Sequence, residues 1–289
     1  MTGIAPPIRP PAQRLRPTVA RERAPQAYAL LADCRLCAHD CGVNRLAGKT
    51  GLCHAGTAAR FFSAQTEVSD ELELIPTFAI ALSGCDLRCD FCITGASSWN
   101  VRAGGSLDAV TMAALARTAL RNGARTIMVL GGEPTIHLPA ALELVSFLPS
   151  TAKLIWKTNA HGSASARDLL DGLFDVWVAD FKFGNDDCAR RLARVSDYTR
   201  IVGENLLWAN THSRLIVRHL LMPGHTDCCW RPIAEWLAAH LPGVKVNLRA
   251  GFWPAWQAQR HTEFRSPLET SEEDRAFRWA RELDLNLIA

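Results

Sequence analysis

Between residues 76 and 248 the chain alternates short apolar segments with longer amphipathic ones, and this alternation restricts the fold more than any other feature. Strands that alternate with helices form parallel sheets with the helices outside, and right-handed crossovers curl such a sheet. Six units fall short of the eight in a closed barrel. We therefore expect an α/β fold, a partial (β/α)6 barrel. The predicted strands cover residues 76–82, 126–130, 153–157, 175–181, 214–221 and 244–248.

Helical periodicity lies between these strands. It predicts helices over 107–122, 139–148 and 230–241. A last helix is expected near residue 270, where Thr270 and Glu273 have the spacing of a capping box. Polar or glycine-rich residues follow each strand, at 83–92, 131–135, 158–162, 180–186, 218–225 and 247–253. Because active sites of such folds lie at the carboxyl ends of the strands, we expect all six segments around one mouth.

The length and composition of the chain are typical of one large domain with a small extension. The chain has 289 residues, of which 48% are hydrophobic, and a net charge of +3 that does not by itself indicate nucleic-acid binding. It contains no apolar run long enough for a membrane span and no secretory pattern near residue 1, so we expect a cytoplasmic protein. Residues 1–26 are rich in proline and arginine and predict a disordered tail. Residues 27–70 form the predicted cysteine-rich cap, and 71–289 the barrel.

Ten cysteines occur, and seven of them form two tight groups. In a cytoplasmic protein, clustered thiols more often bind metal than form disulfides. Cys85, Cys89 and Cys92 make the second group, in the loop after the first predicted strand. A structural zinc ion needs four ligands, whereas three thiolates on a [4Fe–4S] cluster leave one iron open. We therefore predict such a cluster, and a zinc site with a distant fourth ligand is the alternative.

The first group has a complete set of four thiols, Cys34, Cys37, Cys41 and Cys53. Four thiolates satisfy either a structural zinc ion or a second iron–sulfur cluster. The spacing does not separate the two possibilities. An auxiliary cluster would offer an electron route to the first cluster, whereas zinc would hold together a loop-rich cap that has little core of its own.

The Cys-x3-Cys-x2-Cys spacing, with Phe91 before the third cysteine, resembles the radical S-adenosylmethionine (SAM) superfamily. "GGEP" at 131–134 resembles the second motif of that superfamily, and the resemblance extends over residues 75–289. The segments at 34–56, 180–189 and 218–232 further resemble the branch labelled pyruvate formate-lyase activating enzyme homologues.

The resemblance implies a chemistry. SAM would bind the open iron, and one electron, from a donor such as flavodoxin or ferredoxin, would cleave it to methionine and a 5′-deoxyadenosyl radical that abstracts hydrogen from substrate. The backbone at Gly131, Gly132 and Glu133 would meet the methionine end, and Pro134 would fix the turn. Other candidates for contacts with SAM, all near strand ends, are Asn159, Asp180, Lys182, Arg218 and Met222.

Four further residues are candidates for the reaction itself. His219 alternates with Arg218, so only one of the two faces the barrel interior, and a buried structural histidine is the simpler interpretation. Arg249 follows the last strand, where a surface role is an equal alternative. Cys228 and Cys229 are adjacent, so a disulfide between them would be strained. Because the pair lies in the segment that resembles the motif of the branch, a catalytic thiol is kept as a hypothesis.

Three functions compete. The first is a radical SAM enzyme that acts on an unidentified small molecule or peptide. The second is an activase that generates a glycyl radical on a partner protein. The third is a zinc-binding module for nucleic acid or protein, with the arginine-rich tail as its basic arm. The third leaves "GGEP" without an explanation.

Overall fold

The computed structural model describes residues 15–69 and 71–288. Its core is an open sheet in the order β3-β1-β2-β4-β5-β6-β7-β8-β9. The seven strands from β2 to β9 in this order are parallel, whereas β1 runs antiparallel to β2 and β3. The strands are β1 (Arg60–Glu67), β2 (Thr77–Leu82), β3 (Gly105–Ser106), β4 (Thr126–Gly131), β5 (Leu154–Thr158), β6 (Val176–Asp180), β7 (Arg214–Leu220), β8 (Lys245–Arg249) and β9 (Asn286–Leu287).

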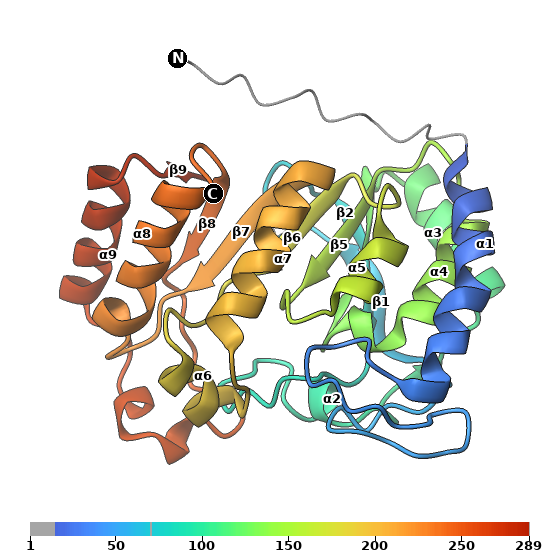
Figure 1. The fold of residues 1–289 in the computed structure, drawn as a ribbon. Helices are drawn as coiled ribbons and strands as arrows, with labels where there is room; N and C mark the ends of the chain where they lie inside the picture. Colours follow the sequence, from blue (N-terminus) through green and yellow to red (C-terminus); the bar gives the residue numbers. More distant parts are fainter. Residues whose placement is uncertain (1–14, 70, 289) are drawn as a thin grey trace.

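The α/β prediction is confirmed: the sheet is mostly parallel and does not close, as in a partial barrel. Helices cover its outer face (Figure 1). The described helices are α1 (Arg16–Ala29), α2 (Ala96–Trp99), α3 (Ala109–Arg121), α4 (Leu138–Phe147), α5 (Ala164–Leu170), α6 (Asp186–Ala193), α7 (Tyr198–His212), α8 (Arg231–His240) and α9 (Thr270–Glu282). Short helical turns are η2 (Leu30–Asp33), η3 (Pro134–His137), η4 (Thr226–Trp230), η5 (Ala258–Arg260) and η6 (Thr262–Arg265).

We predicted a disordered tail over residues 1–26, and this prediction is wrong for residues 16–26. Residues 16–26 belong to α1, which lies alongside α4 (Figure 1). Ala20, Ala24 and Ala27 form a buried stripe on this helix, and their small side chains allow close packing. Arg16 is buried, donates to the Ala152 carbonyl and pairs with a carboxylate at 2.7 Å. Residues 1–14 lie outside the described part.

Two smaller predictions also differ from the structure. Residues 60–67, assigned to the cap, form β1 and pair with β2, so they belong to the sheet. The capping box at residue 270 is wrong: Glu269 is the N-cap of α9, and no side chain accepts a capping hydrogen bond there. Residue 269 is the last residue with extended backbone, so Thr270 is already the first residue of the helix and cannot be its N-cap. The boundaries between cap and barrel stay a prediction.

The inner face of the sheet has an apolar part, called the floor below, and a charged part. Its floor is apolar and buried, formed by Leu74, Met128, Ile155, Val176, Val178 and Ile216. Asp180 continues the face of Val176 and Val178, and Arg218 continues that of Ile216, because side chains two apart on a strand share a face. The inner face therefore becomes charged toward the carboxyl ends of the strands. The cap loops, α2 and α6 lie at that same end (Figure 1).

Candidate functional site

The three-cysteine loop lies at the carboxyl end of β2. Cys85 and Cys89 are buried and Cys92 is half-buried. Burial raises the pKa of Cys85 and Cys89, that of Cys89 to about 12. Buried thiols of this kind become thiolates only beside a positive charge, and a bound metal supplies one. The donor set therefore fits the predicted iron–sulfur cluster.

Two regions hold the loop from outside. The amides of Arg88 and Asp90 donate to the carbonyls at the end of α6, at 3.1 Å and 2.9 Å. The Asp90 carboxylate accepts a hydrogen bond from His261 at 2.8 Å and pairs with Arg194 at 2.9 Å. The loop backbone is thus fixed by α6 on one side and by the segment after β8 on the other.

The "GGEP" segment packs against the same loop. The amide of Gly132 donates to the Leu82 carbonyl, and that of Glu133 to the Gly84 carbonyl, both at 2.9 Å. A Cβ atom on Gly132 would lie 2.0 Å from the Gly84 oxygen, so this position requires glycine. Both amide donors are therefore used within the protein and hold this segment against the triad loop.

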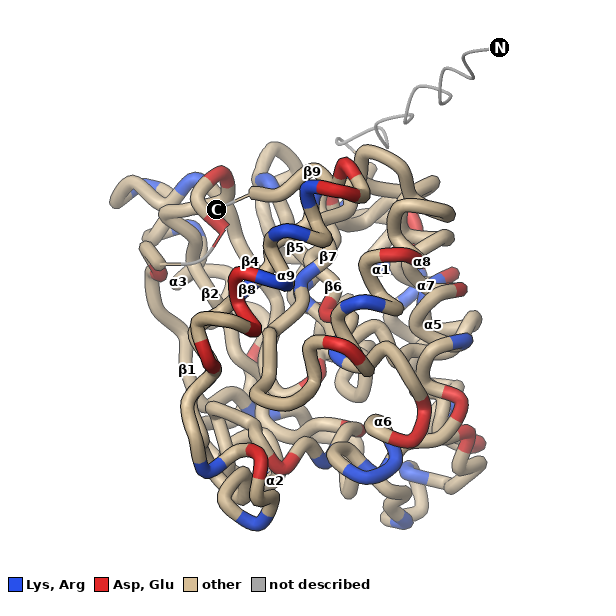
Figure 2. The backbone as a smooth tube through the Cα atoms, turned by 90° about the vertical axis from the view of Figure 1, so that its left-hand side faces the viewer, with Lys and Arg blue, Asp and Glu red and all other residues tan. Residues whose placement is uncertain are grey.

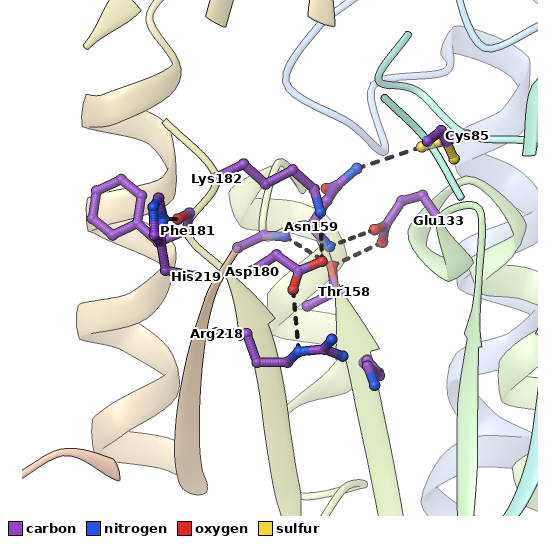
Figure 3. A network of polar contacts seen from close by, with 12 residues as sticks. Cys85, Glu133, Thr158, Asn159, Asp180, Phe181, Lys182, Arg218 and His219 are labelled. Atoms are coloured by element: carbon purple, nitrogen blue, oxygen red, sulfur yellow. Dashed lines mark hydrogen bonds and ion pairs between the residues drawn. The ribbon is translucent and has the colours of Figure 1, made fainter. Parts of the chain in front are cut away.

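The Glu133 side chain turns into the protein rather than toward the mouth. Its carboxylate is buried and accepts from the backbone amide and hydroxyl of Thr135, from the Thr158 hydroxyl at 2.9 Å and from the Asn159 amide at 2.8 Å (Figure 3). Burial, together with the charge of Asp86, raises the pKa of Glu133 to about 7. Glu133 therefore ties the tips of β4 and β5 together. Pro134 begins η3 directly after it.

Asn159 connects the tip of β5 to the cysteine loop. Its Nδ2 donates to Oδ1 of Asp86 at 2.7 Å and lies 3.7 Å from Sγ of Cys85 (Figure 3). Its Oδ1 accepts from the amide of His161. All of these groups are buried, so Asn159 supports the cluster loop from below.

A charged layer lies across the inner face of the sheet. Lys182 Nζ pairs with Oδ2 of Asp180 at 2.6 Å, so these two side chains point the same way (Figure 3). Arg218 lies 3.7 Å from Asp180 and 3.2 Å from Glu71. Lys182 and Arg218 hold the pKa of Asp180 below its usual value although burial alone would raise it. This layer lies close to the triad, because the charges of Lys182 and Asp180 act on the Cys89 thiol.

Glu71 is the member of this layer that the sequence analysis missed. It lies in the loop before β2, is fully buried and accepts from Asn247 at 3.2 Å, with Lys157 3.6 Å away. A single acidic residue in a loop carries no periodic signal. Only the fold brings it beside the cations of β5 and β7.

His219 and Arg218 face opposite sides, as strand alternation requires. His219 lies on the outer face, where its Nδ1–H donates to the Phe181 carbonyl at 2.7 Å (Figure 3). Its ring stacks on that of Trp230. Burial lowers its pKa to about 4, so it is neutral at physiological pH. This arrangement is that of a structural histidine.

The remaining candidates occupy different places. Met222 is buried after β7, and its carbonyl accepts from the amide of His225. Arg249 ends β8 and is half-buried. Cys228 and Cys229 lie in η4, beside Cys188 of α6. The ring of Phe264 contacts both His225 and Phe91, so aromatic side chains lie between this thiol pair and the triad loop.

The cap docks on the same mouth. Cys37 pairs with Gly162 in an isolated β-bridge, and the amide of Ala38 donates to the His161 carbonyl at 3.0 Å. Burial and the neighbouring Asp86 raise the pKa of Cys37. The cap thiols thus lie close to the residue that follows Cys85.

A buried arginine accompanies the cap cysteines. Arg45 donates to the carbonyls of Gly56 and Ile136 and lies 3.5 Å from Sγ of Cys34. A buried guanidinium group needs anionic or carbonyl partners, and four thiolates around a metal carry a net negative charge. The cap cysteines therefore fit a thiolate-held metal, either zinc or an iron–sulfur cluster.

Comparisons with known proteins agree with this geometry. A family model described as the Radical SAM superfamily matches residues 80–237, more than half of the chain. An uncharacterized protein of Methanocaldococcus jannaschii, MJ0674, is 27% identical over 285 residues, which cover 95% of this chain and 82% of that protein.

Two solved structures share the fold. The structure of Streptococcus suis SuiB bound to the precursor peptide SuiA has a TM-score of 0.55 and 16% identity, and the match covers 70% of this chain and 46% of SuiB. A radical SAM methyltransferase from Sphaerobacter thermophilus has a TM-score of 0.52 and 17% identity, over 74% of this chain and 66% of that one. This chain therefore spans less than half of SuiB. At such identities only the fold is shared.

Proposed function

Because this chain belongs to the radical SAM superfamily, we propose that it cleaves SAM reductively at Cys85, Cys89 and Cys92 and abstracts hydrogen from a small molecule or peptide. One observation carries this proposal: the three thiols lie on a single loop at the carboxyl mouth, fixed against the glycines of "GGEP". When bound, a [4Fe–4S] cluster supplies the electron that breaks SAM into methionine and a 5′-deoxyadenosyl radical.

The residues around the mouth divide into two roles. Glu133 and Asn159 are fully engaged with protein groups, so we assign them to positioning the cluster loop. Gly131 and Gly132 would offer carbonyl oxygens to the methionine ammonium group. Lys182 is one-quarter exposed at the mouth and is the candidate for the methionine carboxylate. Its partner Asp180 is the candidate for the ribose hydroxyls.

We place the substrate between the triad and the charged layer of Asp180, Arg218 and Glu71. The apolar floor below this layer is closed by packed side chains. A substrate with both acidic and basic groups would complement such a layer. The peptide named in the SuiB structure belongs to SuiB, and it makes a peptide one class worth testing here.

Two earlier alternatives lose ground. Nothing in the comparisons supports the pyruvate formate-lyase activating branch, so a glycyl-radical activase is an outcome of the substrate test rather than a second proposal. The family match to the radical SAM superfamily gives no support to a zinc-binding interaction module. Basic and acidic residues are also interspersed along the described backbone (Figure 2), whereas a nucleic-acid surface gathers basic residues on one face.

The supporting partners follow from the same proposal. A cytoplasmic flavodoxin or ferredoxin would deliver the electron. A second iron–sulfur cluster in the cap would stand near Asp86 and hence near the triad, whereas zinc there would only hold the cap. Among the described residues, no helix has the length and apolar character that crossing a membrane requires.

The test is anaerobic turnover. Protein with reconstituted iron and sulfide is mixed with SAM and dithionite, and 5′-deoxyadenosine is measured by mass spectrometry. We expect product from the wild type and from the surface variant Asp187→Asn, and none from Cys89→Ala. Absence of product from fully loaded wild type, with and without pools of metabolites and peptides, would contradict the proposal.

A further inference from the structure

Four metal-binding side chains gather outside the radical site. Cys188 lies in the first turn of α6, and His225, Cys228 and Cys229 lie at η4, about forty residues later in the chain. The ligand atoms of all four lie within 4.8 Å of one another. In the part of the chain that the structure describes, neither the triad nor the four cap cysteines form so compact a set.

The separations match the corners of a tetrahedron around one ion. The Sγ atom of Cys228 lies 3.8 Å from that of Cys188 and 3.9 Å from that of Cys229. Nδ1 of His225 lies 3.5 Å, 3.4 Å and 3.6 Å from the sulfurs of Cys188, Cys228 and Cys229. Zinc at about 2.3 Å from sulfur and about 2.0 Å from nitrogen would separate sulfurs by about 3.8 Å and sulfur from nitrogen by about 3.5 Å.

Surrounding groups support the same four atoms. Nε2 of His225, the ring nitrogen that faces away from the thiols, lies 3.6 Å from the carboxylate of Glu263 and 3.2 Å from the guanidinium group of Arg191, which itself pairs with Glu263. A carboxylate beside the outer nitrogen of a ligating histidine is the usual arrangement around zinc. Nδ2 of Asn185 lies 3.3 Å from Sγ of Cys188 and 2.7 Å from the Cys228 carbonyl. An amide donor beside a sulfur stabilises its thiolate form.

The backbone is shaped to bring the two segments together. A Cβ atom on Gly184 would lie 2.2 Å from the Cys229 carbonyl oxygen, so only glycine permits this approach. The turn η4 is a π-helix, a form that occurs mostly as single turns and often at functional sites. Such a turn places two adjacent cysteines and the preceding histidine on one side.

We propose that Cys188, His225, Cys228 and Cys229 bind one zinc ion in a closed structural site. Three thiolates and one imidazole are a known ligand set for structural zinc. A [4Fe–4S] cluster is a poorer occupant, because each of its cysteines binds a different iron and the thiols must stand further apart. These four residues would bind zinc whether or not the radical chemistry proposed above is right.

The zinc ion would brace the radical site from outside. It would join the first turn of α6 to η4. The last turn of α6 accepts hydrogen bonds from the amides of Arg88 and Asp90 in the triad loop, through the carbonyls of Ala193 and Leu192. A rigid α6 therefore fixes the loop that carries Cys89.

The first experiment counts metal in the intact protein. Wild type, Cys228→Ser and His225→Ala are purified without oxygen from zinc-supplemented medium, and zinc, iron and sulfide are measured per chain. We expect each variant to hold one zinc ion fewer than wild type, whatever the cap binds, with iron unchanged. His240→Ala, which removes an exposed histidine of α8, is the matched control and should keep the wild-type count. Equal zinc in all four proteins, or loss of iron instead of zinc, would overturn the proposal.

The second experiment does not depend on the variants folding. Cys228 lies at the surface, so a free thiol there should react quickly with iodoacetamide. If zinc holds it, native wild type should leave Cys228 unlabelled until a zinc chelator is added, as read by peptide mass spectrometry. Rapid labelling before the chelator, or a Cys188–Cys228 disulfide in anaerobically purified protein, would also overturn the proposal.

Discussion

Nδ1 of His161 lies 2.7 Å from a carboxylate oxygen of Asp86, and both side chains are almost completely buried. Asp86 directly follows Cys85, whereas the carbonyl of His161 accepts from Ala38 of the cap. His39 of the cap also bonds the Asp86 carbonyl at 3.0 Å. The pair therefore stands where the triad loop, the tip of β5 and the cap meet. Hydrogen bonds from His161 and Asn159 leave the pKa of Asp86 below its usual value, although burial raises it.

Replacing this carboxylate should disturb both the stability and the triad. Asp86→Asn leaves His161 without an anionic partner, and breaking one side of a buried pair costs about 3 kcal/mol. We expect the free energy of unfolding to fall by about that amount and iron bound per chain to fall with it. Asp187→Asn, on an almost fully exposed side chain, should change neither. Wild-type stability and iron content in Asp86→Asn would show that the pair is not a support of the loop.

The second glycine of "GGEP" should be intolerant of any side chain. In Gly132→Ala the new Cβ would overlap the Gly84 carbonyl and crowd Cys85, so the triad loop must move. We expect at least a tenfold loss of 5′-deoxyadenosine formation and reduced iron content. Gly251→Ala, where nothing lies within 4 Å of the new atom, is the matched control. Full activity in Gly132→Ala would mean that the loop adapts at no cost.

Lys182 offers a direct test of SAM binding. If its ammonium group meets the methionine carboxylate, Lys182→Met should weaken equilibrium binding of SAM by about tenfold to a hundredfold, the usual worth of a charge-assisted hydrogen bond. Iron content should not change, because Lys182 is not a metal ligand. The exposed-lysine variant Lys49→Met is the control. Unchanged SAM affinity in Lys182→Met would remove this residue from the site.

Glu71 and Glu73 are a matched pair two residues apart. Glu71 is fully buried between Arg218, Lys157 and Asn247, whereas Glu73 is 28% exposed and pairs with Arg214 and Lys245. Glu71→Gln should lower the free energy of unfolding by about 3 kcal/mol, since it leaves the half-buried cations of Lys157 and Arg218 beside a neutral amide. Glu73→Gln should cost less than about 1 kcal/mol because solvent screens its pairs. Urea unfolding distinguishes the two, and equal losses would contradict the assignment.

The sequence was most informative where its signal is local. The six predicted strands were confirmed because apolar runs and alternation lie within a few residues. The cysteine spacing is equally local, and the cluster that it indicates stays a prediction. The helix α1 was missed because proline and arginine dominate its composition and hide the stripe of Ala20, Ala24 and Ala27. The stability of that helix comes from packing on α4, which no local pattern reveals.

The rest of the site depends on distant partners. The role of Glu71 can be recognised only in the folded protein, where β5 and β7 bring Lys157 and Arg218 beside it. Nothing close to Cys188 in the sequence indicates a metal site, since its partners are some forty residues away. One local signal was available: His225 and the Cys228–Cys229 pair lie three and four residues apart, a spacing that places ligands on one side of a turn.

The last prediction concerns acid stability and His219. Its pKa in the folded protein is about 4, lowered by burial, whereas that of an unfolded histidine is about 6.5. Unfolding therefore takes up a proton between these two values, so stability falls as the pH falls from about 6.5 toward 4. Between pH 7.5 and 5 this residue should account for about 2 kcal/mol of the loss.

In His219→Asn the amide can still donate to the Phe181 carbonyl without titrating, so the variant should lose about 2 kcal/mol less than wild type over this range. Denaturant unfolding at both pH values measures the difference, with the exposed-histidine variant His240→Asn as the control. Parallel slopes for wild type and His219→Asn would mean that folding does not lower the pKa of His219.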